Sequence, residues 1–333
     1  MATSRVTRER AARLMVIVLA VGIPLAGLMA LAIRPRPTVE LHGRLPEDGG
    51  WTPGDFTAAA GQPIHLRLIS DDVMHGFAIG QSDLPALDLP PGQVVETTIT
   101  FDHPGKYVYY CTRWCGPDHW RMRGTIEVTG PGGATQTDPP LYMALGIDID
   151  APHPAEVVPP ARPSAVRGAA LGLDLAVLDL QPETLRARSP SQAWQALRLN
   201  ASLARLGDAQ LWDLVAFAWR EGAGPGALKE SEGLYNANCA ACHGSQGAGD
   251  GVFAQSLSRA EDAGEGMGEL KPPADFTDAT QMLGASSALL QGKILRGGMG
   301  TGMPSWGPIF SERQIWALVD YLWTFQFDDM EDR

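Results

Sequence analysis

The placement of the four cysteines constrains this chain more than any other feature. Two of them lie in the stretch CTRWCGPDHWRM, residues 111–122, and the other two lie in CAACH, residues 239–243. Two close pairs leave no cysteine for a disulfide framework. A disulfide inside a CxxxC stretch would be strained, and it would not account for the histidine and the methionine that follow. Both stretches therefore indicate sites for a metal or a cofactor.

Length and charge limit the architecture and the partners. A chain of 333 residues suits two or three globular domains. Its net charge of −12 argues against nucleic acid as a partner. From the patterns below we predict a multidomain protein with an N-terminal transmembrane helix, an all-β sandwich and then an all-α region.

Residues 1–36 hold a candidate membrane anchor. Residues 14–33 form a run of twenty residues without a charge, which is long enough to cross about 30 Å of hydrocarbon. Four arginines precede this run and two follow it, so we expect a single pass through the cell inner membrane, with the N-terminus in the cytoplasm and the soluble domains on the periplasmic side. A cleaved signal peptide that ends at ALA, residues 30–32, is the alternative, although the apolar core of a signal peptide is usually shorter.

Residues 37–130 show the pattern of a small β domain. Four runs rich in β-branched and aromatic residues are separated by Gly, Pro and Asp, and no helical period competes with them. The pattern predicts an antiparallel sandwich or barrel. Its predicted strands are residues 63–70, 94–101, 105–111 and 124–130.

The loops of this β domain carry a set of soft metal ligands. His75 follows the first predicted strand, and the loop between the last two holds Cys111, Cys115, His119 and Met122. Loops from different strands meet at one end of a sandwich, and thiolate, imidazole and thioether donors favour copper over magnesium or calcium. Two cysteines four residues apart, each able to bridge, can hold two metal ions. A zinc site is the alternative, but zinc would have no need of the methionine.

The stretch DVMHGFAI followed by CTRWCGPDHWRM resembles the binuclear copper A (CuA) domain of haem-copper oxidase subunit II, a cupredoxin fold, over about residues 38–130. The resemblance implies that both cysteines of the loop bridge two copper ions. It also implies that two ligands complete each copper. These are His75 and Met122 for one ion, and His119 and the backbone carbonyl of Arg113 for the other.

Arg113 departs from the family pattern. Many subunit II sequences have a glutamate at this position that helps to hold a magnesium ion, and an arginine cannot do so, so we predict no magnesium site. The likeness is therefore closer to divergent oxidases and to nitric oxide reductases that carry CuA. A single N-terminal span, in place of the usual two, agrees with this.

Residues 226–333 contain the haem-attachment motif CxxCH. Cys239 and Cys242 would form thioethers to a haem, and His243 would be the proximal iron ligand. A methionine downstream would supply the second axial ligand. Met303 is favoured because MPSW resembles the loop that supplies this ligand in small class I cytochromes c, and Met299 is the alternative. A thioether ligand raises the reduction potential and suits electron transfer.

The end of this cytochrome region reads as an amphipathic helix over residues 311–327. Its apolar residues recur at i, i+3, i+4 and i+7, and Ser311 is the expected N-cap. The periodic residues are Ile315, Leu318, Val319 and Leu322.

Two segments lie between the β domain and the cytochrome region. Residues 131–165 are rich in proline, and we predict a semi-extended linker that is not packed. Residues 166–225 include a stretch, 207–220, that lines up with 311–324 and shares its Gln, Trp, Leu and Val positions. We interpret 166–225 as a cytochrome-like helical segment without covalent haem. Chance similarity of two amphipathic helices is the alternative.

Two one-electron cofactors, a binuclear CuA and one haem c, would then sit on one anchored chain. Neither keeps an obvious open coordination position, so we expect no catalytic site in this chain. The order of anchor, CuA domain and cytochrome resembles subunit II of oxidases with a fused cytochrome c. The resemblance implies that electrons from a cytochrome or cupredoxin donor enter at the haem, pass to CuA, and go on to a membrane-embedded subunit I.

The sequence is compatible with three other functions. The equivalent subunit of a CuA-containing nitric oxide reductase would use the same relay. A copper-handling or redox-sensing membrane protein would bind a single copper at CxxxC and would not need Met122. A free membrane-anchored electron carrier would have no fixed partner.

Overall fold

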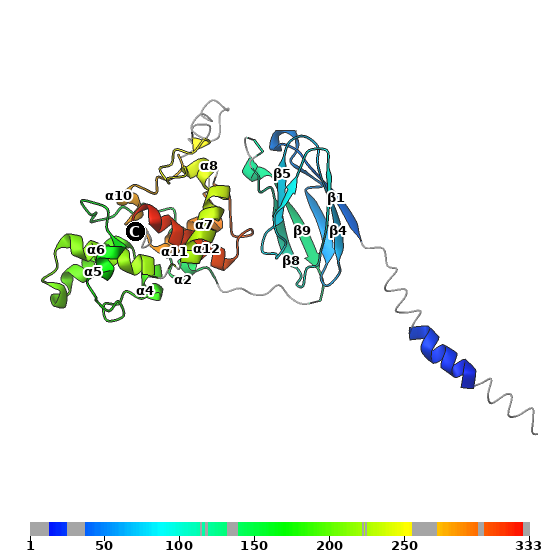
Figure 1. Cartoon of the computed structure of the whole chain (residues 1–333), viewed down its shortest axis with the longest axis horizontal. Coiled ribbons are helices and arrows are strands. Elements are labelled where there is room, and N and C mark those ends of the chain that lie inside the picture. The colour runs from blue at the N-terminus through cyan, green and yellow to red at the C-terminus, as the bar shows by residue number, and fades with distance from the viewer. Residues whose placement is uncertain are drawn as a thin grey trace, which may run out of the picture.

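A computed structural model gives the structure of the chain (Figure 1). It describes residues 13–24, 37–113, 115–116, 119–131, 139–221, 223, 225–254, 272–298 and 303–328. A β-sandwich lies beside a helical region, and its strands β5 and β8 are on the side that faces the helices (Figure 1).

The predicted membrane span is only partly described. Residues 13–24 are helical, and residues 25–33 lie outside the described residues. Within the described part of the chain, no helix has both the length and the apolar character needed to cross a membrane. The anchor over residues 14–33 therefore stays a prediction.

Two sheets form the sandwich. The first has the order β2-β1-β4-β7 and the second has the order β3-β9-β8-β5-β6. The strands of the first sheet are β1 (Thr38–Gly43), β2 (Trp51–Thr52), β4 (Ile64–Ser70) and β7 (Val94–Ile99). Those of the second are β3 (Asp55–Ala59), β5 (His75–Ile79), β6 (Leu87–Leu89), β8 (Gly105–Tyr110) and β9 (Arg123–Thr129).

The four predicted strands correspond to β4, β7, β8 and β9, but the prediction of a purely antiparallel domain was wrong. β1 pairs with β4 in parallel, and β3 pairs with β9 in parallel. The chain crosses from the first sheet to the second between β2 and β3 and returns at β4. This crossing supplies the long connection that a parallel pair requires.

The core of the sandwich follows from alternation along its strands. In β4 every second residue, from Ile64 to Ser70, is buried. Between the sheets, the rings of Trp51, Phe77 and Tyr109 pack with centroids 5.6–5.8 Å apart. The Tyr109 hydroxyl donates to the carbonyl of Pro53 at 2.6 Å, so its polar end is satisfied inside the core.

The helical region has one hydrophobic core that extends over both the predicted haem-less segment and the cytochrome region. The longest helices of the first are α5 (Pro190–Leu199) and α6 (Asp208–Glu221), which follow α3 (Ala165–Ala169) and α4 (Pro182–Ala187). The second contains α7 (Pro225–Asn238), α8 (Ala240–His243), α10 (Ala279–Met282), α11 (Ser287–Arg296) and α12 (Glu312–Leu322). The Ser311 side chain caps α12, and Gln314 completes the capping box, so the predicted N-cap is confirmed.

The prediction that residues 131–165 form an unpacked linker was wrong for residues 139–165. The short helix α2 (Leu141–Ala144) packs against α11, and Ile149 is only 2% exposed. Asp150 pairs with Arg296, and the backbone N–H of Ala155 donates to the carbonyl of Thr280 at 2.7 Å. A proline-rich segment can pack in this way because neighbouring helices satisfy its few polar groups.

Candidate metal and cofactor sites

The first site begins with His75, the first residue of β5, whose side chain is completely buried. Its Nε2 lies 2.7 Å from the carboxylate of Asp72, and its Nδ1 lies 3.8 Å from the sulfur of Cys111. A carboxylate can only accept here, so Nε2 carries a proton, and Nδ1 is the ring nitrogen that faces the cysteine. Burial lowers the pKa of His75, but the bonds to Cys111 and Asp72 raise it by more.

Asp72 is a candidate positioning residue that the sequence reasoning missed. Its carboxylate also accepts from the backbone N–H groups of Leu45 and Val73, both at 2.6 Å. Three donors therefore fix its position, and it in turn fixes the ring of His75. The only signal in the sequence is an acid three residues before a histidine, which has no specificity.

The cysteine loop brings the remaining predicted ligands to the same place. Cys111, which directly follows β8, has its sulfur 3.2 Å from the carbonyl oxygen of Arg113. The sulfur of Cys115 lies 3.5 Å from Nδ1 of His119 and 3.8 Å from the sulfur of Met122. All six predicted positions thus come together, and the donor atoms of His75 and the two cysteines lie within 4.8 Å of one another.

The two thiols of this site interact strongly. A hydrogen bond from Cys115 lowers the pKa of Cys111, and the same interaction raises the pKa of Cys115. The backbone N–H of Gly76 also donates to the sulfur of Cys111 at 3.4 Å. The pocket thus favours a thiolate before any metal enters, which is the form that binds metals.

The Arg113 side chain points away from this cluster. Its guanidinium forms a two-pronged ion pair with Asp88 of β6, at 2.7 and 2.8 Å, and is 56% exposed. Only its backbone carbonyl faces the sulfur atoms. The role of this carbonyl as a copper ligand stays a prediction.

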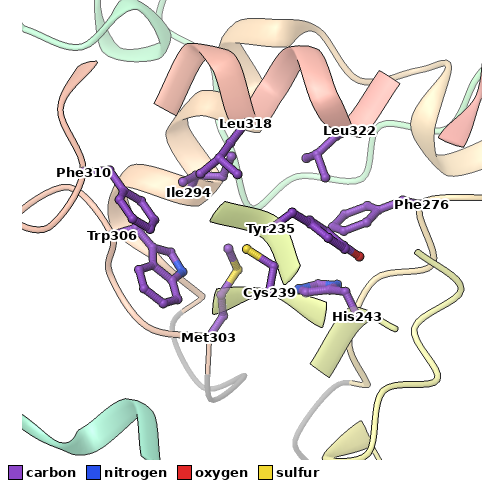
Figure 2. Close-up of a pocket in the computed structure, with 10 residues that line it drawn as sticks. All are labelled: Tyr235, Cys239, His243, Phe276, Ile294, Met303, Trp306, Phe310, Leu318 and Leu322. Carbon is purple, nitrogen blue, oxygen red and sulfur yellow. The ribbon is translucent and has the colours of Figure 1, made fainter. Parts of the chain in front are cut away.

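The second site is a pocket in the helical region (Figure 2). The side chains of Cys239, His243 and Met303 converge at one end of it, and aromatic and aliphatic groups form the rest of the wall. These wall residues are Tyr235, Phe276, Ile294, Trp306, Phe310, Leu318 and Leu322. An apolar pocket that ends in two sulfurs and an imidazole has the chemistry to hold a haem.

His243 ends α8 and is oriented by one hydrogen bond. Its Nδ1 lies 3.0 Å from the carbonyl of Ala274, so Nδ1 carries the proton and Nε2 remains free to bind a metal. Its ring stacks on Phe276 with centroids 4.5 Å apart. Burial lowers the pKa of His243, which keeps the ring neutral, as a metal ligand must be.

The structure describes both attachment cysteines but only one of the two candidate axial methionines. Burial raises the pKa of Cys239 to about 12 and also raises that of Cys242, so both are neutral thiols. Met303 lines the pocket, whereas Met299 lies outside the described residues. The assignment of Met303 over Met299 therefore stays a prediction.

Comparisons with known proteins divide the chain in the same way. Residues 57–129 match the family model of cytochrome c oxidase subunit II, periplasmic domain. Residues 226–322 match the family model of cytochrome c oxidase, cbb3-type, subunit III. The chain thus combines a subunit II domain with a cytochrome c domain. The resemblance to subunit II with a fused cytochrome c is confirmed.

Curated relatives of the subunit II domain come from Thermus thermophilus. Cytochrome c oxidase subunit 2 of this species is 34% identical over 79 residues, which cover 24% of this chain and 58% of the relative. A second subunit 2 sequence from the species has the same identity over 79 residues and is covered to 46%. The chain therefore spans about half the length of the curated relatives it matches.

Solved structures show weaker similarity. The periplasmic domain of subunit II of cytochrome oxidase from Bradyrhizobium japonicum is 20% identical, with 29% of this chain and 88% of that chain covered and a TM-score of 0.25. A chain of a heme-copper terminal oxidase dimer is 23% identical, with 37% and 99% covered and a TM-score of 0.25. Scores this low do not establish a shared architecture for the whole chain.

Proposed function

We propose that this chain is the electron-transfer subunit II of a haem-copper terminal oxidase. It would relay electrons from a covalent haem c in the cytochrome domain to a binuclear copper centre in the subunit II domain, and on to a membrane-embedded subunit I. The observation that carries this proposal is the presence of two complete donor sets on one chain, one of soft copper ligands and one built around CxxCH.

The copper centre would be held by the predicted ligands. Cys111 and Cys115 would bridge two ions, with His75, Met122, His119 and the carbonyl of Arg113 completing the set. Bound copper supplies a one-electron centre. The protein fixes the donors, keeps His75 in one tautomer through Asp72, and buries Met122 to 1% exposure, which shields the centre from water.

The haem would be held by Cys239, Cys242 and His243, with Met303 as the second axial ligand. Bound haem supplies a one-electron iron, and a thioether ligand raises its potential. The aromatic wall excludes water, and the Tyr235 hydroxyl donates to the carbonyl of Gly244 at 2.7 Å, which holds the turn after the motif.

Membrane anchoring is part of the proposal. The uncharged run over residues 14–33 supports it, and the described large apolar side chains of this run, from Leu14 to Ile23, are 48–66% exposed, as a lipid-facing surface requires. The partners would then be the lipid bilayer, subunit I, and a soluble or membrane-bound electron donor.

The test is the metal content and spectrum of the purified full-length chain. Elemental analysis should give two coppers per iron, and an EPR spectrum should show one unpaired electron shared over two coppers. A single copper per iron with a mononuclear spectrum would contradict the proposal and favour copper handling. Oxygen and nitric oxide turnover of the co-purified complex distinguishes an oxidase from a nitric oxide reductase.

A further inference from the structure

One loop of the cytochrome domain, residues 303–310, has two faces. Met303, Trp306 and Phe310 line the haem pocket on one face (Figure 2). On the opposite face, carbonyl oxygens of the same loop point to the subunit II domain. The loop is also tied to its own domain, because the backbone N–H of Trp306 donates to the carbonyl of Ile294 at 3.1 Å.

Three hydrogen bonds from the subunit II domain reach this loop. The guanidinium of Arg123 donates to the carbonyl of Ser305 at 2.7 Å. The side-chain amide of Gln81 donates to the carbonyl of Gly307 at 2.8 Å, and its backbone N–H donates to the carbonyl of Ile309 at 3.2 Å. Alternate residues of the loop therefore accept bonds from two elements of one sheet, the start of β9 and the turn after β5.

Arg123 joins the two candidate sites. It directly follows Met122, a predicted copper ligand, and its guanidinium carbon lies 5.1 Å from the ring centre of Trp306 in the haem pocket wall. Its guanidinium is charged at neutral pH, as arginine side chains in proteins are. No carboxylate in the described part of the chain pairs with it. The hydrogen bond and the cation–π contact of its guanidinium are both with the cytochrome loop.

Gly80 permits the close approach of the two domains. A Cβ atom at this position would lie 2.5 Å from the carbonyl oxygen of Pro308 and 2.7 Å from the Cα of Ile309. Its φ angle lies outside the left-handed region, so an alanine would fit the strand end itself. Glycine is needed here because of the neighbouring domain.

We propose that Arg123, together with Gly80 and Gln81, latches the loop 303–310 onto the subunit II domain and holds the haem pocket wall next to the copper ligand Met122. The inference rests on the proposed function for its role in electron transfer. A flexible tether raises the encounter rate of two domains but leaves their arrangement variable. The latch fixes one arrangement of the two domains, and with both cofactors bound, the electron given up by the haem would reach the copper centre across a packed contact rather than across a variable gap.

The first experiment measures the latch in the full-length chain without cofactors. Amide hydrogen exchange reports the N–H of Gln81, which is bonded across the interface. In Arg123→Gln, loss of a charged hydrogen bond should speed this exchange on the order of tenfold. Arg67→Gln is the matched control, because Arg67 pairs with Glu40 and Glu96 on the opposite sheet.

The second experiment uses the loaded chain. After rapid reduction of the haem, the rate of electron arrival at copper should fall on the order of tenfold in Arg123→Gln, with copper and haem content unchanged. Gly80→Ala should cause the same two effects through steric exclusion. Gly54→Ala is its control, since a Cβ there would have its nearest neighbour at 3.8 Å.

The two experiments separate the latch from the proposed function. The proposal is overturned if the Gln81 N–H exchanges at the same rate in Arg123→Gln as in Arg67→Gln. It is also overturned if the two variants transfer electrons to copper at the same rate. If the chain bound no copper pair, the proposed function would fail, while the exchange of Gln81 would still test the latch by itself.

Discussion

At the scale of single residues, one ring nitrogen of each of two candidate histidine ligands is engaged by an oxygen acceptor. His75 donates from Nε2 to Asp72, and His243 donates from Nδ1 to the carbonyl of Ala274. The opposite ring nitrogen, Nδ1 of His75 or Nε2 of His243, is therefore the candidate metal ligand in each histidine. In both domains the oxygen acceptor, the Asp72 carboxylate or the Ala274 carbonyl, determines which ring nitrogen carries a proton.

Replacing Asp72 with alanine tests this orientation at the copper site. Without the carboxylate the ring of His75 can rotate and exchange tautomers, so copper affinity should fall about 10–100-fold. Titration of the full-length chain against a copper chelator measures the change. Asp102→Ala, at an exposed loop position of the same domain, should bind copper as the unchanged chain does. Equal affinities for the two variants would mean that Asp72 has no positioning role.

Replacing Met303 tests the haem ligand. Met303→Ala should remove the spectrum of a methionine-ligated haem and lower the reduction potential, because a thioether ligand favours the reduced iron. Absorption spectroscopy and a potentiometric titration measure both effects. Met299→Ala is the matched control and should change neither. The opposite result would assign the axial position to Met299.

At the scale of elements, the sequence patterns that repeat were the ones that predicted structure. The periodic residues Ile315, Leu318, Val319 and Leu322 are all at most 5% exposed, and α12 begins after the predicted cap. β5 was not predicted, because all five of its residues are buried and so show no alternation. β2 and β6, with two and three residues, are too short for any period to appear.

The site residues also fall into two groups, those that a local motif reveals and those that no sequence pattern reveals. Ligand spacing in the cysteine loop and in CxxCH is local, so the motifs located both candidate sites. Gly80 and Arg123 could not be found by pattern, because each acts on a partner that only the fold brings near. Asp72 was missed because an acid three residues before a histidine has no specificity. The packing of residues 139–165 was also missed, because a proline-rich stretch has no apolar period that indicates which residues are buried.

Asp320 makes the stability of α12 depend on pH. Burial raises the pKa of this carboxyl to about 6 from its ordinary 3.8, although Arg186 and Arg220 act in the other direction. The folded chain then binds a proton more tightly than the unfolded chain does. The free energy of unfolding should therefore fall as pH rises from about 4 to about 7, through the folded pKa.

Asp320→Asn should remove this dependence and raise the free energy of unfolding at pH 7 by roughly 1–3 kcal/mol. Denaturant unfolding of the helical region at pH 5 and pH 7 measures it. Glu183→Gln, at an exposed position of α4, should keep the dependence of the unchanged chain. If Asp320→Asn were no more stable than the unchanged chain at pH 7, the charge of Asp320 would not destabilise the folded protein.

At the scale of the whole molecule, two hydrophobic cores serve two sites. The sandwich has its own core around Trp51, Phe77 and Tyr109, and the helices have another. The sandwich residues Val108 and Tyr110 pack against the helical core from outside. Each domain can therefore form its site from its own residues, while the loop 303–310 sets how the two sites lie relative to each other.

This independence predicts separate loss of the two cofactors. Cys115→Ser should abolish the two-copper EPR signal and leave the haem, because Cys115 contacts His119 and Met122 within the sandwich and lies far in the chain from CxxCH. His243→Ala should remove the normal haem spectrum and leave the copper, because its partners Ala274 and Phe276 both lie in the helical region, and Phe276 is part of the helical core. Copper and iron per chain, measured on both variants, check the two results, and each variant is the control for the other. Loss of both metals from either variant would mean that the two cores do not fold independently, and the contact through Arg123 would then be part of a single folding unit.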